Sequence, residues 1–369
     1  MNGRRLFRTL VTSICLSAPG VARAGGVVVK SVGYQLIEGE KFPAFYAHLL
    51  GKDFSAAWQQ YQQANAGSAQ EMFLDDGSRP QSNDFASVTV ENDGDAPAEG
   101  LRLQMTVEGF AEPATQSVPA LKPGESATVA MTPAFNDNIY ATQESAPANV
   151  DTKLLDAQGN VLFEKTRRIT ILSKDYMVWG IDSDYDLAYG IAAFVTPHDS
   201  GKAIDKLLSA AAEKAPGRAL GGYQGDDHQL AVEQQAKAIY DTIHEMGVKY
   251  VNAPISFGKN DQRVKLPAES LADKSGNCIE GTLLFASAFE SLGMRPVVIL
   301  APGHAFVGVR LWDDDDTILP IETTMVGTDP YKDAVKTAID ELNQYLGEGT
   351  ATIVDVTVLR QLGVTPSPS

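Results

Sequence analysis

The spacing of apolar residues lengthens near Trp179. From Asp84 to Leu172 apolar and polar residues alternate in short runs, which is the period of β-strands that bury one face. After Trp179 the apolar residues recur about every 3.6 residues, as amphipathic helices require. A chain of 369 residues has room for two hydrophobic cores. We therefore expect an all-β domain followed by a mixed one.

The first region predicts a small antiparallel sandwich. The predicted strands are Phe85 with 87–90, then 100–107, 127–131, 150–155 and 161–172. Segments rich in turn-forming residues separate them at 92–95, 122–125 and 156–160. Short strands at this spacing are typical of an immunoglobulin-like β-sandwich, which we place at 84–175. Residues 25–83 show no clear pattern beyond a helix expected around 54–64.

The second region predicts an α+β domain over 176–362, followed by a tail at 363–369. The expected helices begin after Gly201, cover 230–246 and run from Cys278 to Gly293. Three strands are then expected at 296–301, 304–312 and 317–322, and a further helix and a closing strand at 331–346 and 351–359. Helices followed by antiparallel strands describe the α+β class.

Residues 1–24 have the features of a secretory signal peptide. Arg4, Arg5 and Arg8 give a basic start, a mildly apolar stretch follows, and small residues surround the expected cleavage after Ala24. The apolar stretch is too short to span a bilayer. Adjacent arginines also resemble a twin-arginine signal, with an ordinary signal as the alternative. We therefore expect a periplasmic or secreted protein.

Charge excludes several classes of partner. Loss of a leader with four arginines and no acid would take the formal net charge from −17 to −21. Such a field disfavours nucleic acid and anionic lipid. No later stretch is apolar enough to cross a membrane, so no membrane span is expected.

Cys278 is the only cysteine left once Cys15 is removed with the leader. A lone thiol in an oxidising compartment cannot form an internal disulfide, so its presence calls for a chemical reason. The predicted helix begins at Cys278, and the positive end of the helix dipole would stabilise the reactive thiolate. A small buried apolar role is the plain alternative.

Two further residues complete a candidate triad with Cys278. His304 follows Pro302-Gly303, after a stretch long enough for a helix, a turn and a strand that return the chain. Glu322 follows on the next strand, and a turn centred on Asp314 would make it a diagonal neighbour of His304 on one face. Thiolate, base and orienting acid are the parts of a cysteine triad.

Metal and cofactor chemistry is not expected. The five histidines and the remaining cysteine show no metal-ligand spacing. The segment 182–186 imitates the start of a calcium loop, but Leu187 and Ala193 replace the glycine and glutamate that such a loop needs.

These motifs together resemble the transglutaminase-like superfamily over about a quarter of the chain, from Gln234 to Gly327. The matching runs are 264–267 (Val-Lys-Leu-Pro), 276–281 (Gly-Asn-Cys-Ile-Glu-Gly), 292–294 (Leu-Gly-Met), 302–306 (Pro-Gly-His-Ala-Phe) and 321–324 (Ile-Glu-Thr-Thr). The resemblance implies a papain-like α+β core, with Cys278 as nucleophile, His304 as base and Glu322 in the place usually held by aspartate. Glu280 falls where these proteins often carry an acid.

Two departures from the family pattern bear on the reaction. Glutamate at 322 is one methylene longer than aspartate, which could loosen the imidazole or shift the strand register. Phe306 stands where an indole is common, and no tryptophan lies near Asp241, which weakens protein cross-linking as the native reaction. Gln262 is a candidate oxyanion donor because a glutamine lies a short loop upstream in papain-like enzymes; a solvated loop amide is the alternative.

The sequence thus predicts an exported cysteine hydrolase of transglutaminase-like type, a peptidase or amidase that works through a thioester. Its substrate would be a protein or peptide, and the sandwich would present it or dock a protein partner. Two alternatives stay open. One is a non-catalytic binding or scaffold protein with the same fold, and the other is a true protein-glutamine cross-linking transglutaminase.

Overall fold

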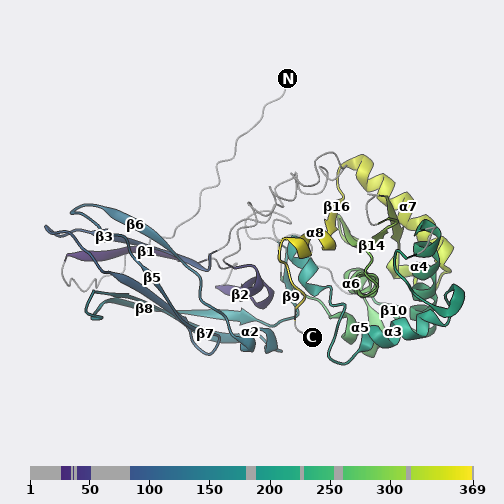
Figure 1. Cartoon of the computed structure of the whole chain (residues 1–369), viewed down its shortest axis with the longest axis horizontal. Helices are drawn as coiled ribbons and strands as arrows, with labels where there is room; N and C mark the ends of the chain where they lie inside the picture. The colour runs from purple at the N-terminus through teal and green to yellow at the C-terminus, as the bar shows by residue number, and fades with distance from the viewer. Residues whose placement is uncertain are drawn as a thin grey trace, which may run out of the picture. The chain divides into compact units, whose positions relative to one another are not determined.

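The computed structural model describes residues 26–34, 36, 40–50, 84–179, 188–224, 228–252, 261–312 and 317–367 (Figure 1). The expected signal peptide and the helix expected around 54–64 lie outside these residues. The described chain is a mixed α+β structure with several sheets.

The chain forms two compact units, each assembled from separate segments. The β unit contains the residues up to Leu36 together with Asp84–Asn136 and Pro147–Ile169. The mixed unit contains Ile37–Asn83, Asp137–Ala146 and Thr170–Ser369. The units therefore do not follow one boundary near residue 175, and the described residues between 26 and 50 contribute to both. Alternation along individual strands carries no information on which unit a connecting segment joins.

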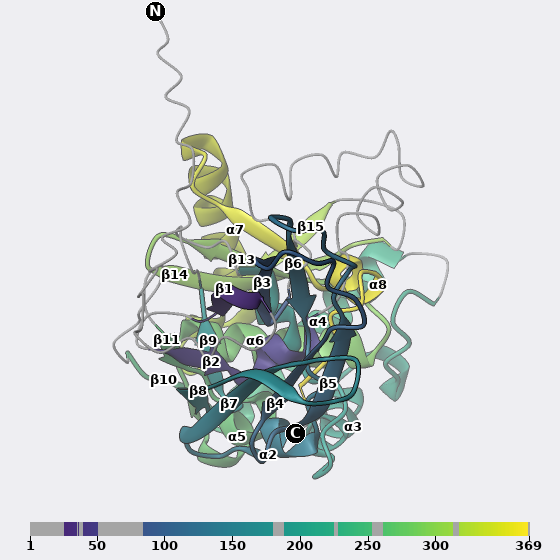
Figure 2. The ribbon, with the colours of Figure 1, turned by 90° about the vertical axis from the view of Figure 1, so that its left-hand side faces the viewer.

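The β unit has two layers of strands, which Figure 2 shows end-on. One sheet is antiparallel with the order β1-β3-β6. The other has the order β8-β7-β4-β5 within this unit. The strand bounds are β1 Val27–Tyr34, β3 Ala86–Asn92, β4 Arg102–Val107, β5 Ala111–Ser117, β6 Ser126–Met131, β7 Ala146–Leu155 and β8 Val161–Leu172.

Two strands of the β unit were not predicted. β1 lies in the segment that showed no clear pattern. In β5 only Ala111 is buried, and Pro113 sits inside the strand. Proline within a strand is tolerated at a sheet edge, where its missing N–H leaves no ladder bond unmade. An edge strand with one buried residue shows no alternation, so its sequence looked like a loop.

Short elements make up the first part of the mixed unit. β2 (Lys41–Pro43) pairs in parallel with Thr170–Leu172, and β9 (Tyr176–Val178) pairs antiparallel with β11 (Asp261–Arg263). Several aromatic side chains are buried here, namely Phe42, Phe45, Tyr46, Trp179 and Phe194. The remaining short elements are η1 Ala44–His48, α2 Asp137–Ala141, η3 Ala188–Phe194 and η4 Pro216–Arg218.

The helix α6 (Cys278–Ser291) is the centre of the mixed unit, and Figure 1 shows it nearly end-on. Most of its residues are buried all round, and it packs against β14 and α5. A helix that is apolar on every side belongs in a core. The other helices and the short strand pair are α3 Ala203–Ala212, α4 His228–Glu245, β10 Lys249–Tyr250, α5 Pro267–Asp273, β12 Ser275–Gly276, α7 Tyr331–Glu348 and α8 Val356–Gln361. None of the helices described combines the length and apolar character needed to cross a bilayer.

A four-stranded antiparallel sheet lies against α6. Its order is β15-β14-β13-β16, with β13 Pro296–Ala301, β14 His304–Arg310, β15 Ile318–Ile321 and β16 Thr352–Asp355. Every residue of β13 is buried, so both faces of the sheet are covered. Ala338 and Leu342 of α7 pack on the face that carries Phe306, which leaves the other face to α6.

The expected closing strand at 351–359 is too long. It ends at Asp355, whose side chain accepts a hydrogen bond of 3.1 Å from the Val358 backbone N–H and so caps α8. An aspartate that can cap a helix favours a helix start over a continued strand.

Candidate functional site

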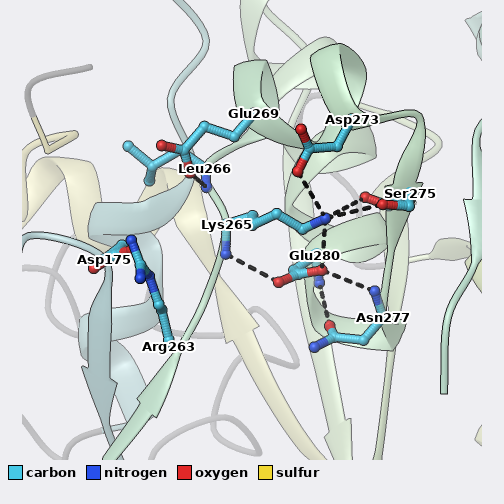
Figure 3. Close-up of polar contacts among 9 residues, drawn as sticks. All are labelled: Asp175, Arg263, Lys265, Leu266, Glu269, Asp273, Ser275, Asn277 and Glu280. Carbon is cyan, nitrogen blue, oxygen red and sulfur yellow. Dashed lines mark hydrogen bonds and ion pairs between the residues drawn. The ribbon is translucent and has the colours of Figure 1, made fainter. Parts of the chain in front are cut away.

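Cys278 is the first residue of α6, and a capping box fixes that helix start (Figure 3). The Asn277 side chain accepts a hydrogen bond of 3.0 Å from the Glu280 N–H. The Glu280 carboxylate accepts one of 2.9 Å from the Asn277 N–H. These two bonds satisfy backbone donors that a helix N-terminus leaves unpaired. The thiol therefore sits at the positive end of the helix dipole.

Glu280 also ties the loop before α5 to this helix start. Its second oxygen accepts a hydrogen bond of 3.0 Å from the Lys265 N–H. The Lys265 ammonium bonds the Ser275 carbonyl at 2.9 Å and lies 3.4 Å from Asp273 (Figure 3). The buried acid two residues after the cysteine is therefore structural in its contacts. The Asn277-x-x-Glu280 spacing is the signal that could have predicted this.

His304 begins β14 and is paired with Ala301 across the turn Pro302-Gly303. The backbone of Gly303 has φ of 72°, a conformation that favours glycine. The His304 ring lies on Phe306, with centroids 5.7 Å apart and planes at 27°. This packing and the tight turn fix where the imidazole points.

Glu322 directly follows β15 and meets His304 as the hairpin register predicts. Val307 pairs with Ile321, the register that brings residue 304 level with 324. One Glu322 oxygen lies 2.7 Å from His304 Nε2. The other accepts hydrogen bonds of 2.8 Å and 2.6 Å from the N–H and hydroxyl of Thr324. The longer side chain is therefore held at both oxygens, and the register is not shifted.

A close approach between α6 and η5 (Thr323–Met325) brings the cysteine to this pair. A Cβ on Gly281 would lie 3.0 Å from the Thr323 hydroxyl oxygen and 3.2 Å from its Cβ. The Thr282 hydroxyl bonds the Cys278 carbonyl at 2.7 Å, and the Thr323 hydroxyl lies 3.4 Å from the same oxygen. A side chain at 281 would press on Thr323, so glycine allows this close contact without displacing the threonine.

The site holds a charged imidazole. Burial by itself would lower the pKa of His304, but hydrogen bonds with Cys278 and Glu322, the contact with Glu341 and the charge of Glu322 raise it to about 12. Burial would raise the pKa of Glu322, but the bonds from His304 and Thr324 lower it below its usual range. Near neutral pH the pair is therefore imidazolium and carboxylate. Because Nε2 faces the carboxylate, Nδ1 is the nitrogen left for the Cys278 sulfur.

Glu341 on α7 is a second acid at the same nitrogen, and it was not predicted. Its Oε2 lies 3.7 Å from His304 Nε2. The ligand atoms of His304, Glu322 and Glu341 lie within 4.8 Å of one another, a spacing that a divalent cation could bridge. Nε2 already bonds Glu322, so the contacts described are those of a protonated ring between two carboxylates.

Access to the sulfur is restricted. Cys278 is 0% exposed, whereas 21% of the His304 side chain and 39% of Tyr250 are exposed. Tyr250 lies beside the site because β10 pairs in parallel with β12 and places Tyr250 opposite Gly276. Burial is the main cause that raises the pKa of Tyr250. The sulfur is therefore covered, while the imidazole and the Tyr250 side chain are partly exposed.

Gln262 was predicted as an oxyanion donor, and that role stays a prediction. It lies in β11 opposite Met177, is buried, and its side-chain oxygen has no hydrogen-bond partner. No hydrogen bond among the described residues joins it to Cys278, His304 or Glu322. It is not the solvated loop amide that was the alternative, because it is a buried strand residue. The calcium-like segment 182–186 and the hairpin tip 313–316 lie outside the described residues.

Comparison with known proteins adds no assignment: no family model matches the chain, and a search of curated proteins found no match either.

Proposed function

We propose that this protein is an exported cysteine-dependent acyl-transfer enzyme that hydrolyses peptide or amide bonds through a thioester. One observation carries the proposal: the thiol at the start of α6 interacts with the His304 imidazole, and that imidazole is hydrogen-bonded to the Glu322 carboxylate. The proposal includes a papain-like, transglutaminase-like core for the mixed unit. The central helix packed on an antiparallel sheet supports it.

The chemistry follows from the charge states. The Cys278 thiolate attacks the amide carbonyl carbon, a C–S bond forms, and negative charge develops on the oxygen. The Cys278 backbone N–H at the helix start is one donor for that oxygen. The His304 imidazolium then gives its Nδ1 proton to the leaving amine as the C–N bond breaks. The neutral ring next takes a proton from water, which attacks the thioester, breaks the C–S bond and restores the thiolate.

The β unit and the location belong to the same proposal. Two layers of strands with alternating burial support an immunoglobulin-like sandwich that presents a protein substrate or docks a partner. The basic and apolar start of the sequence supports export to the periplasm or the medium.

The burial of the sulfur favours a second candidate function. With Cys278 fully covered, substrate can reach it only if neighbouring groups move. A protein that keeps this fold for binding, without turnover, needs no such movement. The triad contacts nevertheless favour the enzyme, because a buried apolar role for Cys278 gives no reason for a protonated imidazole beside it.

Alkylation of the folded protein by iodoacetamide across the pH range separates these functions. Labelling at Cys278 is located by mass mapping, with Cys278→Ala as the control. We expect reaction well below pH 8.5, about the pKa of an ordinary thiol, and loss of this acid-range reaction in His304→Gln. An alkylation rate that rises only near pH 8.5, as for an ordinary thiol, would contradict the enzyme. So would a Cys278 thiol that reacts only after the protein unfolds. Hydrolysis against amine incorporation on a peptide library then distinguishes a hydrolase from a cross-linking enzyme.

A further inference from the structure

Glu341 faces His304 from an element that the triad does not use. It is carried by α7, while the triad residues come from α6, β14 and the end of β15. Its Oε2 is shielded from solvent and has no hydrogen-bond donor at normal distance, although 31% of the Glu341 side chain as a whole is exposed. Among the described residues, His304 is the cation within ion-pair distance of this carboxylate, at 3.7 Å.

A shielded carboxylate oxygen without a hydrogen bond is unfavourable unless a cation faces it. Glu341 has that cation only while His304 is protonated. By contrast, Glu322 is held at both oxygens by His304 and Thr324. The two acids therefore differ in kind: Glu322 fixes where the ring points, and Glu341 acts on the ring by charge alone.

We propose that Glu341 is a positioning residue that acts through His304 and sets the pH range over which the thiolate–imidazolium pair exists. This inference rests on the proposed function, since it concerns the same reacting pair. It adds a second carboxylate, from α7, to the three residues that the sequence predicts.

Among the residues that the structure describes, the charged and titratable groups around His304 come from four elements. They are Cys278 from α6, Glu322 after β15, Glu341 from α7 and Tyr250 from β10. A nearby carboxylate opposes loss of the thiol proton and also opposes loss of the ring proton, because both steps add negative charge. Thiolate and imidazolium coexist over a range of pH. Removing the Glu341 charge should therefore lower both the acid and the alkaline limit of that range.

The same charge has opposite effects on the two half-reactions. While the imidazolium must give its proton to the leaving amine, a second carboxylate holds that proton back. Once the acyl group has neutralised the sulfur, the same carboxylate makes the neutral ring a stronger base toward water. Glu341 therefore favours hydrolysis of the thioester over its formation.

The test compares Glu341→Gln with Glu348→Gln, which removes the same charge from an exposed position on the same helix. In the full chain, with EDTA present to exclude bridging cations, we measure alkylation of Cys278 by iodoacetamide against pH. The acid limit is the pH below which Cys278 is no longer alkylated. It should fall by about one pH unit in Glu341→Gln, as expected for loss of one nearby charge. It should stay unchanged in Glu348→Gln. A purely structural role would change the rate without moving the limit.

A second readout does not depend on reaction at sulfur. In a Cys278→Ala background, the His304 ring is titrated by NMR with and without Glu341→Gln. Its pKa should fall by about one unit on removal of the charge, and Glu341→Asp, which keeps the charge at shorter reach, should give a smaller fall. An unchanged ring pKa in folded Glu341→Gln overturns this inference. Absence of acid-range alkylation in the unmodified chain instead overturns the proposed function, so the two failures are distinct.

Discussion

The two units of the molecule differ in which polar side chains they bury. In the β unit, the buried polar residues among those described are the uncharged Asn92 and Thr152, and charged side chains stay at the surface. In the mixed unit, charged residues are buried within networks, namely Asp175, Asp199, Glu280, Arg310, Glu322 and Asp355. Burying a charge is costly unless it is paired and hydrogen-bonded. The mixed unit, which buries these charged residues, is also the unit that contains the candidate triad.

This difference teaches where reactive chemistry can be located. A sheet with one wet face leaves its charges in water, where solvent and salt screen them. A sheet covered on both faces shields its charges, and neighbours then shift their pKa values. The shifted pKa values of His304 and Glu322 follow from that enclosure.

The largest expected effect compares an ion pair from each unit. Arg310 and Asp355 of the mixed unit lie 3.1 Å apart with side chains 0% and 4% exposed. Lys30 and Glu91 of the β unit lie 3.1 Å apart with side chains 49% and 30% exposed. Asp355→Asn should lower the free energy of unfolding by about 3–5 kcal/mol, because it removes a buried carboxylate that pairs with both Arg310 and Arg295. Glu91→Gln should cost less than about 1 kcal/mol.

Urea unfolding followed separately for the two units measures both changes. Equal losses in the two variants would show that the contrast between the units does not extend to stability.

A second prediction tests the contact between α6 and η5. Gly281→Ala should push Thr323 away and shift Glu322, and we expect the acid-range alkylation rate of Cys278 to fall about 10- to 100-fold. Gly347→Ala is the matched control, since this α7 glycine has nothing within 4 Å of an added Cβ. The control should raise the free energy of unfolding by about 0.5–1 kcal/mol and leave alkylation unchanged. Normal reactivity in Gly281→Ala would mean that the close approach does not position the triad.

A third prediction concerns the pH dependence of stability. The lowered pKa of Glu322 contributes stability above its ordinary value of 4.5, which is lost as the pH falls. The raised pKa of His304 contributes stability that is complete below 6.5 and is lost as the pH rises toward about 12. The pair should therefore stabilise the mixed unit most between about pH 4.5 and 6.5.

Thermal unfolding of the unmodified chain and of Glu322→Gln across pH measures this contribution. The difference between their melting temperatures should be greatest in that window and shrink on either side. A difference in melting temperature that grows steadily toward alkaline pH would contradict the assigned directions of the two pKa shifts.

Much of the mixed unit could be predicted because its signals are local. The starts of α6, β13 and β14 coincide with those expected, and the Val307–Ile321 register is the one that the hairpin argument required. Cys278, His304 and Glu322 lie together as their order along the chain suggested. Each of these inferences rested on one strand, one turn or one helix start.

The missed features depend on distant partners. β5 is an edge strand that its partner β4 selects, and its own residues are mostly polar. Glu341 lies on a helix whose sequence explains it as an exposed acid, and only packing of α7 on the sheet turns it toward His304. Gln262 could not be judged either, since its strand exists only through pairing with β9.

By itself, the sequence determined the change of period that divides strands from helices, the helix start under the thiol, and the order of sulfur, imidazole and acid. Those properties depend on residues that are neighbours along the chain. The tertiary structure alone decided that the sulfur is covered and that a second carboxylate faces the ring. It also decided that the two units interleave in the chain. Burial and charge pairing depend on which surfaces meet, and that is settled by packing between segments far apart in the chain.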